Sequence, residues 1–302
     1  MNVQNILNEI EKVDPEVYDR LDSRRDVMRR FSFLGKTLAL AAIPAAFGSM
    51  LKKAYGQSTA SDIVDALKFA YLLENLEAEF YKKVVSSFAT VGVPSGPAQT
   101  ALTVIRDHEI AHVNFLKTTL TTGLGQTVPT YTAASFDFTG GAGSGNGPFA
   151  AAFMAGGYPV LLAVAQTFED TGVRAYKGQA PRLMSNNDVL TAALQIHSVE
   201  ARHAAHIRQM RRNLTGTNLV PAGTTLQPWI TLKQSGIATG NAGADAAIQA
   251  SYNGEEVTTQ AGVNIVGTFG GITISANEAS EAFDEPLTKA EVTSIVTPFL
   301  VP

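Results

Sequence analysis

The amino-acid sequence predicts an all-α core, built as an antiparallel four-helix bundle with a long crossover between its second and third helices. Two observations predict this fold. Between residues 62 and 214, four stretches repeat apolar side chains at helical spacing. The second and third stretches are separated by residues 124–157, which are rich in turn-forming residues and too numerous for a tight connection. Two helix hairpins joined by one long connection form a known kind of four-helix bundle.

Glycine and proline mark the ends of the predicted helices. The helices are expected at residues 62–90, 98–122, 158–178 and from Asn187 or Asp188 to Leu214. The first stops before Gly92, and the second runs to Gly123, where a glycine suits the position just past a helix end. Pro159 falls in the first turn of the third helix, where proline is tolerated. The helix ends therefore support the same fold.

The sequence after the fourth helix predicts a loop-rich C-terminal extension. Gly, Thr, Ala and Asn are frequent there, and short β-favouring runs at 229–232 and 263–274 indicate one hairpin. A helical segment returns at 277–283, and Thr288 and Glu291 then have the spacing of a capping box before a terminal helix. We therefore divide the chain into an N-terminal helix with an export signal (1–57), the bundle (58–215) and the extension (216–302).

The N-terminal region has the pattern of an export signal. Two arginine pairs, Arg24-Arg25 and Arg29-Arg30, precede an apolar segment at 37–51 that is short for a membrane span, which needs about 20 residues. A basic region before a short apolar segment is typical of a signal peptide, and the arginine pairs resemble a twin-arginine signal. The prediction is export to the periplasm or outside the cell, with a membrane tether if the signal is not cleaved. The alternative is an ordinary buried helix.

The composition excludes several kinds of site. The chain has no cysteine, which excludes disulfides, Cys-ligated zinc, iron–sulfur clusters and thiol catalysis. Any metal must therefore be held by carboxylates and imidazoles. The net charge of −4 and the pI near 5.8, without a stripe of Lys and Arg, predict no nucleic-acid partner.

Two Glu-x-x-His motifs carry the chemistry. Glu109 and His112 lie in the second predicted helix, and Glu200 and His203 lie in the fourth. Residues three apart share one face of a helix, so each pair can hold one ion together. The neighbours on that face are apolar, and a carboxylate buried among them is costly unless a charge compensates it. A divalent metal ion would provide that charge.

The other two helices each offer a glutamate in a matching frame. Glu74 is followed seven residues later by Tyr81, and Glu169 is followed seven residues later by Tyr176. The chain therefore contains an internal repeat, in which a helix with Glu and Tyr precedes a helix with Glu-x-x-His. A pseudo-twofold pair of hairpins would bring the residues of all four helices to one midpoint. Glu77 lies on the same face as Glu74 and is its main rival as a ligand.

This set of motifs resembles the ferritin-like di-iron and di-manganese proteins, in which two helices give one Glu each and two give Glu-x-x-His. The resemblance covers about residues 62–214 and extends to rubrerythrin, bacterioferritin and manganese catalase. Rubrerythrin and bacterioferritin also carry a tyrosine seven residues after the first ligand glutamate. The export signal, the long crossover and the ending FDEPLTKAEV resemble the bacterial ferritin-like family related to plant desiccation-related proteins.

The resemblance implies two iron or manganese ions per chain. Its ligands would be Glu74, Glu109, His112, Glu169, Glu200 and His203, with Glu109 and Glu200 bridging the ions. Tyr81 and Tyr176 are implied to be hydrogen-bonding or redox-active neighbours of the ligands.

The remaining histidines have less defined roles. Bacterioferritin-type motifs often carry Asp just before the motif glutamate, whereas here those positions are His108 and Val199. We expect His108 and His197 to be surface or packing groups, and His206 to be a structural or outer neighbour of the ligands. The partner that orients each ligand histidine is therefore not evident from the sequence.

Ligation by oxygen and nitrogen suits iron or manganese better than calcium or structural zinc. The leading hypothesis is a dimetal oxidoreductase with oxidase, ferroxidase or peroxide-consuming activity. Its partners would be a small oxidant (dioxygen or peroxide) or ferrous iron, the export machinery, and a second copy of the chain in a homo-oligomer. The alternative is a non-enzymatic metal-binding or stress- and desiccation-protective protein. An iron-storage cage is disfavoured, because the export signal and the long extension do not suit a sealed shell.

Overall fold

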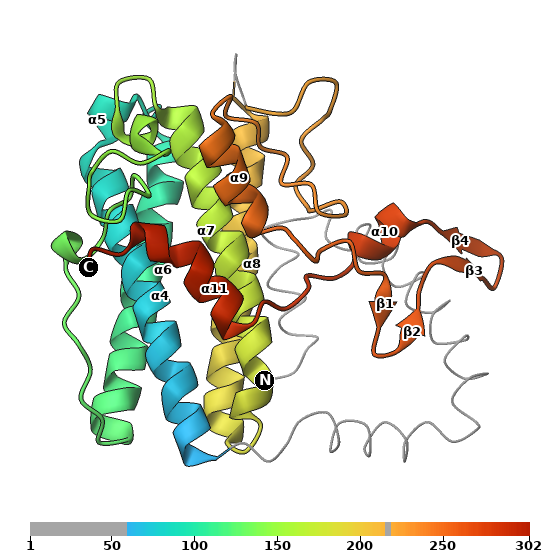
Figure 1. The fold of residues 1–302 in the computed structure, drawn as a ribbon, viewed down its shortest axis with the longest axis horizontal. Coiled ribbons are helices and arrows are strands. Elements are labelled where there is room, and N and C mark those ends of the chain that lie inside the picture. Colours follow the sequence, from blue (N-terminus) through green and yellow to red (C-terminus); the bar gives the residue numbers. More distant parts are fainter. Residues whose placement is uncertain (1–58, 215–218) are drawn as a thin grey trace, which may run out of the picture. The chain divides into compact units, whose positions relative to one another are not determined.

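The computed structural model describes residues 59–214 and 219–302. The predicted N-terminal helix and export signal lie outside the described residues. Four long helices lie side by side (Figure 1): α4 (Ala60–Ser86), α6 (Pro97–Thr118), α7 (Tyr158–Gln179) and α8 (Asn187–Arg212). These helices confirm the predicted all-α core. In the part of the chain that the structure describes, no helix is long and apolar enough to cross a membrane.

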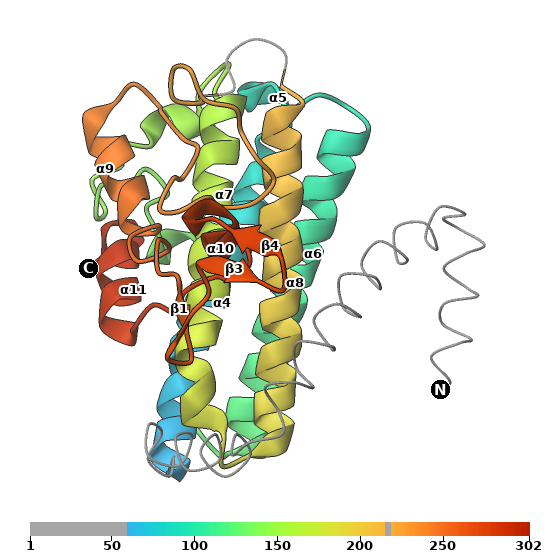
Figure 2. The same cartoon turned by 90° about the vertical axis from the view of Figure 1, so that its right-hand side faces the viewer.

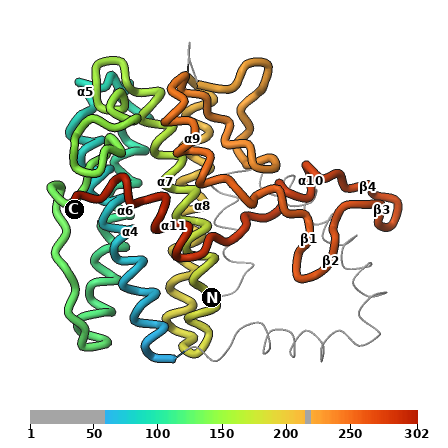
Figure 3. The backbone as a smooth tube through the Cα atoms, in the orientation of Figure 1, coloured from blue at the N-terminus to red at the C-terminus, as the bar shows by residue number. Residues whose placement is uncertain are grey.

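The order of the helices explains the long crossover. Helices α4 and α6 pack as one antiparallel hairpin with the short helix α5 (Phe88–Val91) between them, and α7 and α8 pack as a second hairpin. Helix α6 ends at one end of the bundle, and α7 begins at the other. Residues 124–157 therefore run along the length of the bundle, as Figure 3 shows in green, with only short 3₁₀ turns at Ala133–Ser135 and Ala150–Phe153.

The helix ends follow local rules that the sequence contains. Thr59 caps α4, because its side chain accepts a hydrogen bond from the Asp62 N–H while the Asp62 carboxylate accepts from the Thr59 N–H. Pro159 occupies the first turn of α7, as predicted. Gly92 ends α5 with a φ of 84°, a left-handed conformation that favours glycine. Local sequence therefore sets where these helices start and stop.

The C-terminal extension carries short elements around the bundle. They are the helices α9 (Ala242–Ala250), α10 (Ala276–Ser280) and α11 (Lys289–Val296), and the strands β1 (Thr259–Gln260), β2 (Val263–Asn264), β3 (Gly267–Phe269) and β4 (Ile272–Ile274). The strands form two antiparallel pairs, β1 with β2 and β3 with β4, which project from the side of the bundle (Figure 1). The predicted capping box of Thr288 and Glu291 is confirmed at the start of α11.

Three details of the extension differ from the sequence-based expectation. One hairpin was expected, but two antiparallel strand pairs form. The run at 229–232 forms no strand and has only an isolated bridge between Thr231 and Gln234. Helix α9 was not expected, because its nine residues are mostly Ala and Gly and its small apolar face resembles the surrounding loops. Asn241 nevertheless caps it by accepting a hydrogen bond from the Ala244 N–H.

The extension covers the outer face of α7, which is why this helix is buried nearly all round (Figure 2). Asp170 forms a buried ion pair with Arg208 and accepts a hydrogen bond from the Tyr252 hydroxyl at 2.5 Å. One turn further on, Arg174 donates to the Ser251 carbonyl at 2.6 Å and pairs with a Glu255 carboxylate oxygen at 2.8 Å. Buried polar groups that are paired in this way fix the position of the extension on the bundle.

Two apolar clusters fill the bundle, one towards each end. The larger includes Phe80, Leu161 and Phe168, and the smaller includes Leu67 and Leu116. The polar residues of the two Glu-x-x-His motifs lie at helix positions between these clusters. The interior of the bundle therefore holds a polar midpoint enclosed by apolar ends.

Candidate metal centre

The six predicted ligand residues meet at the midpoint of the bundle. They form two overlapping groups, Glu74, Glu109, His112 and Glu200, and Glu109, Glu169, Glu200 and His203. Within each group, one ligand atom from every residue lies within 4.8 Å of the others. Glu109 and Glu200 belong to both groups, which is the arrangement that bridging ligands require.

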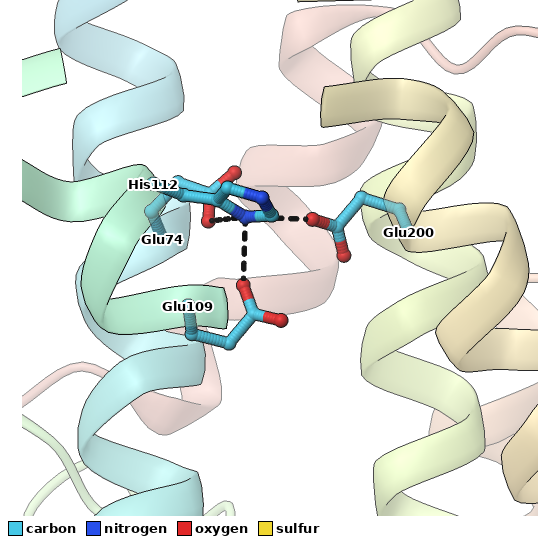
Figure 4. Close-up of side chains that lie close together, drawn as sticks. All are labelled: Glu74, Glu109, His112 and Glu200. Carbon is cyan, nitrogen blue, oxygen red and sulfur yellow. Dashed lines mark hydrogen bonds and ion pairs between the residues drawn. The ribbon is translucent and has the colours of Figure 1, made fainter. Parts of the chain in front are cut away.

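In the first group, one imidazole nitrogen faces three carboxylates. His112 Nδ1 lies 3.1 Å from Glu74 Oε2, 3.2 Å from Glu109 Oε2 and 3.1 Å from Glu200 Oε1. Figure 4 shows these side chains converging from three different helices. Such a set of nitrogen and oxygen atoms, directed at one point, has the composition of a transition-metal site.

The second group repeats the first with the halves of the bundle exchanged. His203 Nδ1 lies 2.9 Å from Glu109 Oε1, 3.2 Å from Glu169 Oε2 and 3.8 Å from Glu200 Oε2. Both histidines therefore direct the same ring nitrogen at the shared carboxylates. The internal repeat of the sequence appears in the structure as this pseudo-twofold arrangement.

The two predicted tyrosines each hold a glutamate of the opposite helix. The Tyr81 hydroxyl of α4 donates a hydrogen bond to Glu169 of α7, and the Tyr176 hydroxyl of α7 donates to Glu74 of α4. Burial, with the adjacent carboxylate, raises the pKa of both hydroxyls well above the ordinary value. Both tyrosines thus stay protonated and remain donors, which fixes the orientation of the two terminal glutamates.

Burial dominates the electrostatics of the shared ligands. It raises the pKa of Glu109, with the nearby Glu200 adding to the shift, and raises the pKa of Glu169 to about 7. Burial opposes the ionisation of Glu200 too, but the neighbouring imidazoles of His112 and His203 lower its pKa to about 2. The carboxylates in turn raise the pKa of both imidazoles, against the effect of burial. When no cation is bound, the positive charge of the protonated histidines therefore balances the negative charge of the carboxylates.

Several carboxylate oxygens of the cluster lack hydrogen bonds. Oε1 of Glu109 and both oxygens of Glu200 are buried and have no hydrogen-bond donor within the described parts of the chain. Imidazole nitrogens lie nearby, but not in hydrogen-bonding geometry. Buried carboxylate oxygens without donors carry a large desolvation cost. Since these oxygens belong to the two shared residues, the cluster fits a pair of cations bound between them.

Glu77, the rival for Glu74, is buried next to the cluster but belongs to neither ligand group. It packs on the α7 side, where a Cβ at Gly172 would lie 3.3 Å from Glu77 Oε1 and 3.6 Å from Glu200 Oε2. A glycine in mid-helix costs roughly 1 kcal/mol relative to alanine, and here it leaves room for two carboxylates. The geometry therefore favours Glu74 as the ligand, with Glu77 as a neighbouring carboxylate.

His108 is exposed at the surface, as expected. Its Nδ1 also lies 2.9 Å from His203 Nε2, a contact that the sequence analysis did not predict. His197 packs as expected, with Nδ1 2.9 Å from the Val173 carbonyl oxygen. His206 is exposed, lines a groove at the end of the bundle and belongs to neither ligand group. The sequence signal for His108 was its position just before the motif glutamate.

Comparison with known families agrees with this geometry. The ferritin-like domain matches residues 62–213, which is half of the chain and includes all six clustered residues. The chain therefore belongs to the ferritin-like domain family. Neither the comparison with curated proteins nor that with solved structures found a match.

Proposed function

We propose that the bundle binds two iron or manganese ions per chain and acts as a dimetal oxidoreductase. The observation that carries this proposal is the pair of overlapping ligand groups that share Glu109 and Glu200. The reactants would be dioxygen or peroxide, with ferrous iron as a further substrate. Bound as a pair, redox-active ions supply two electrons together, which is the number that peroxide reduction requires.

The charge of the site supports two divalent ions. The four ligand carboxylates, Glu74, Glu109, Glu169 and Glu200, carry four negative charges when ionised, which two divalent cations balance. Glu77 adds a fifth carboxyl group, and burial raises its pKa well above the ordinary value, which favours its neutral form. The donor set contains only oxygen and nitrogen, which suits iron and manganese.

The surrounding side chains position the ligands and keep out water. Tyr81 and Tyr176 hold Glu169 and Glu74 by hydrogen bonds, so these carboxylates need little reorganisation to bind an ion. The two apolar clusters close the bundle on either side of the cluster along its axis. A dry, rigid site of this kind strengthens electrostatic interactions with bound ions.

The face between α6 and α8 is the route we propose for small oxidants. These two helices make few contacts with each other, and the His112 side chain is 12% exposed there. On the opposite side, Glu77 lies beneath Ile295 and Val296 of α11, which close the bundle. Dioxygen or hydrogen peroxide would therefore reach the ligands past the imidazoles.

Turnover assays test the proposal. Metal-free protein is loaded with ferrous iron or Mn²⁺ and assayed for peroxide decomposition and for ferrous-iron oxidation. Glu109→Ala and His203→Ala should each abolish metal-dependent turnover, because each removes a ligand. Loaded wild-type protein that turns over no faster than a metal-free control would contradict an enzymatic role. That result would favour the alternative, a metal-binding protein with a protective role in stress or desiccation.

Export is a second proposal, supported by the arginine pairs and the apolar segment at 37–51. Cell fractionation of the full chain should find processed protein outside the cytoplasm. The double change Arg24→Lys and Arg25→Lys should block that processing. Wild-type protein that stays unprocessed in the cytoplasm, unaffected by the double change, would contradict export.

A further inference from the structure

The two halves of the metal centre differ in how their histidines are held. His203 contacts the carboxylates through Nδ1, and its other ring nitrogen, Nε2, lies 2.9 Å from His108 Nδ1. The two ring planes are within 18° of each other, and the ring centroids are 5.2 Å apart. A nitrogen–nitrogen distance this much shorter than the centroid distance means that the rings lie edge to edge. This is the geometry of an in-plane hydrogen bond between the imidazoles.

This contact has a direct consequence for ligation. An imidazole that binds an ion through Nδ1 carries its proton on Nε2, and that N–H then needs an acceptor. His108 Nδ1 provides the acceptor and fixes both the tautomer and the rotation of the His203 ring. Partners of this kind typically change metal affinity 10- to 100-fold when they are removed.

Among the residues that the structure describes, the other half of the site has no such partner. The internal repeat places Val199 at the position that corresponds to His108, and a valine side chain can neither donate nor accept a hydrogen bond. His112 directs Nδ1 at three carboxylates, but its Nε2 forms no hydrogen bond with any residue that the structure describes. The His112 ring is also the more exposed of the two, at 12% against 6% for His203.

We propose that His108 is a positioning residue that makes the two metal positions unequal. The position formed with Glu169 and His203 binds its ion more tightly, and the position formed with Glu74 and His112 binds the second ion weakly and exchanges it. This inference rests on the proposed function, since it requires the cluster to bind two ions. It adds that the chain holds one resident ion and one exchangeable ion.

Calorimetric titration of metal-free protein with Mn²⁺ tests the inference. Wild-type protein should show two binding steps of different affinity. Glu74→Ala should remove the weak step, and Glu169→Ala should remove the tight step. His108→Ala should weaken the tight step about 10- to 100-fold and leave the weak step unchanged. His108→Asn should retain most of the affinity, because its side-chain oxygen can occupy the place of the imidazole Nδ1.

His206→Ala is the matched control, since it removes an exposed histidine of α8 that belongs to neither ligand group. Its two binding steps should equal those of the wild-type protein. If the wild-type protein takes up no Mn²⁺ or ferrous iron, the proposed function and this inference both fail. If two ions bind but His108→Ala changes neither step, or weakens both equally, only the inequality of the positions is overturned.

Discussion

Glu109→Gln is the substitution that removes the metal centre with the least change to the fold. Glu109 is fully buried and belongs to both ligand groups, so its loss should affect both of the proposed ions. Glutamine has nearly the same volume as glutamate, so no cavity forms. The metal-free variant should be at least as stable as the wild-type protein, because the change relieves repulsion with Glu200.

The size of the effect follows from linkage. An ion present at 100 times its dissociation constant stabilises the native state by about 2.7 kcal/mol, so two independent ions stabilise it by roughly 5 kcal/mol. In a domain of this size, each kcal/mol raises the melting temperature by about 2–4 °C. Saturating Mn²⁺ should therefore raise the wild-type Tm by roughly 10–20 °C. Glu109→Gln should lose most of that increase.

Thermal unfolding followed by circular dichroism, with and without Mn²⁺, measures this difference. A chelator added to the loaded wild-type protein should bring its Tm back to the metal-free value. His206→Ala should show the full metal-dependent increase, since His206 is exposed and belongs to neither ligand group. An unchanged increase in Glu109→Gln would refute the assignment of Glu109 as a shared ligand.

Three further outcomes are expected. The metal-free protein should lose stability as the pH rises from 5 to 8. The reason is that Glu169 has a folded pKa of about 7 against an ordinary 4.5, so the folded protein binds more protons than the unfolded chain in that range. Denaturant titrations that show rising stability would contradict this. Tyr81→Phe should cost about 1.5–3 kcal/mol in the same assay through its lost hydrogen bond to a carboxylate, and no loss would show that the contact contributes nothing. Gly178→Ala should destabilise the fold by about 1–3 kcal/mol, because its Cβ would lie 1.9 Å from the Leu287 carbonyl oxygen. Gly123→Ala, which meets no neighbouring atom, is the control and should be close to neutral.

Much of the candidate site could be predicted because its spacing is local. The three-residue separation of Glu109 and His112, and the seven-residue separation of Glu74 and Tyr81, each place two side chains on one helix face. The internal repeat then predicted which residues of the two hairpins lie together, since equivalent positions of two related hairpins fall at the same height in the bundle. Each tyrosine contacts a glutamate of the other hairpin. The repeat implies two equivalent tyrosine contacts but does not specify which glutamate each tyrosine meets.

The contact of His108 could not be predicted in the same way. It depends on the rotation of α6 relative to α8, which is set by packing along the whole bundle rather than by residues near the motif. Its exposed position on the helix pointed to the surface, yet an edge-to-edge contact with His203 needs only one ring nitrogen to face inward.

The extension was predicted in outline but not in its contacts. Gly178 was expected to mark the end of a helix, and α7 does end at Gln179, but the glycine also allows the backbone at Leu287 to approach closely. The buried pairs of Asp170 with Arg208 and of Arg174 with Glu255 join residues about 40 and 80 positions apart. No local pattern links such residues, because loop-rich segments carry little periodicity.

Metal analysis of natively purified protein tests the central claim most directly. Wild-type protein should contain iron or manganese approaching two ions per chain, or take up two ions on reconstitution, as the two ligand groups require. Glu109→Gln, purified in parallel, should contain neither ion at a comparable level. Trace metal in the wild-type protein, with no uptake on reconstitution, would contradict the assignment of this cluster as a dimetal site.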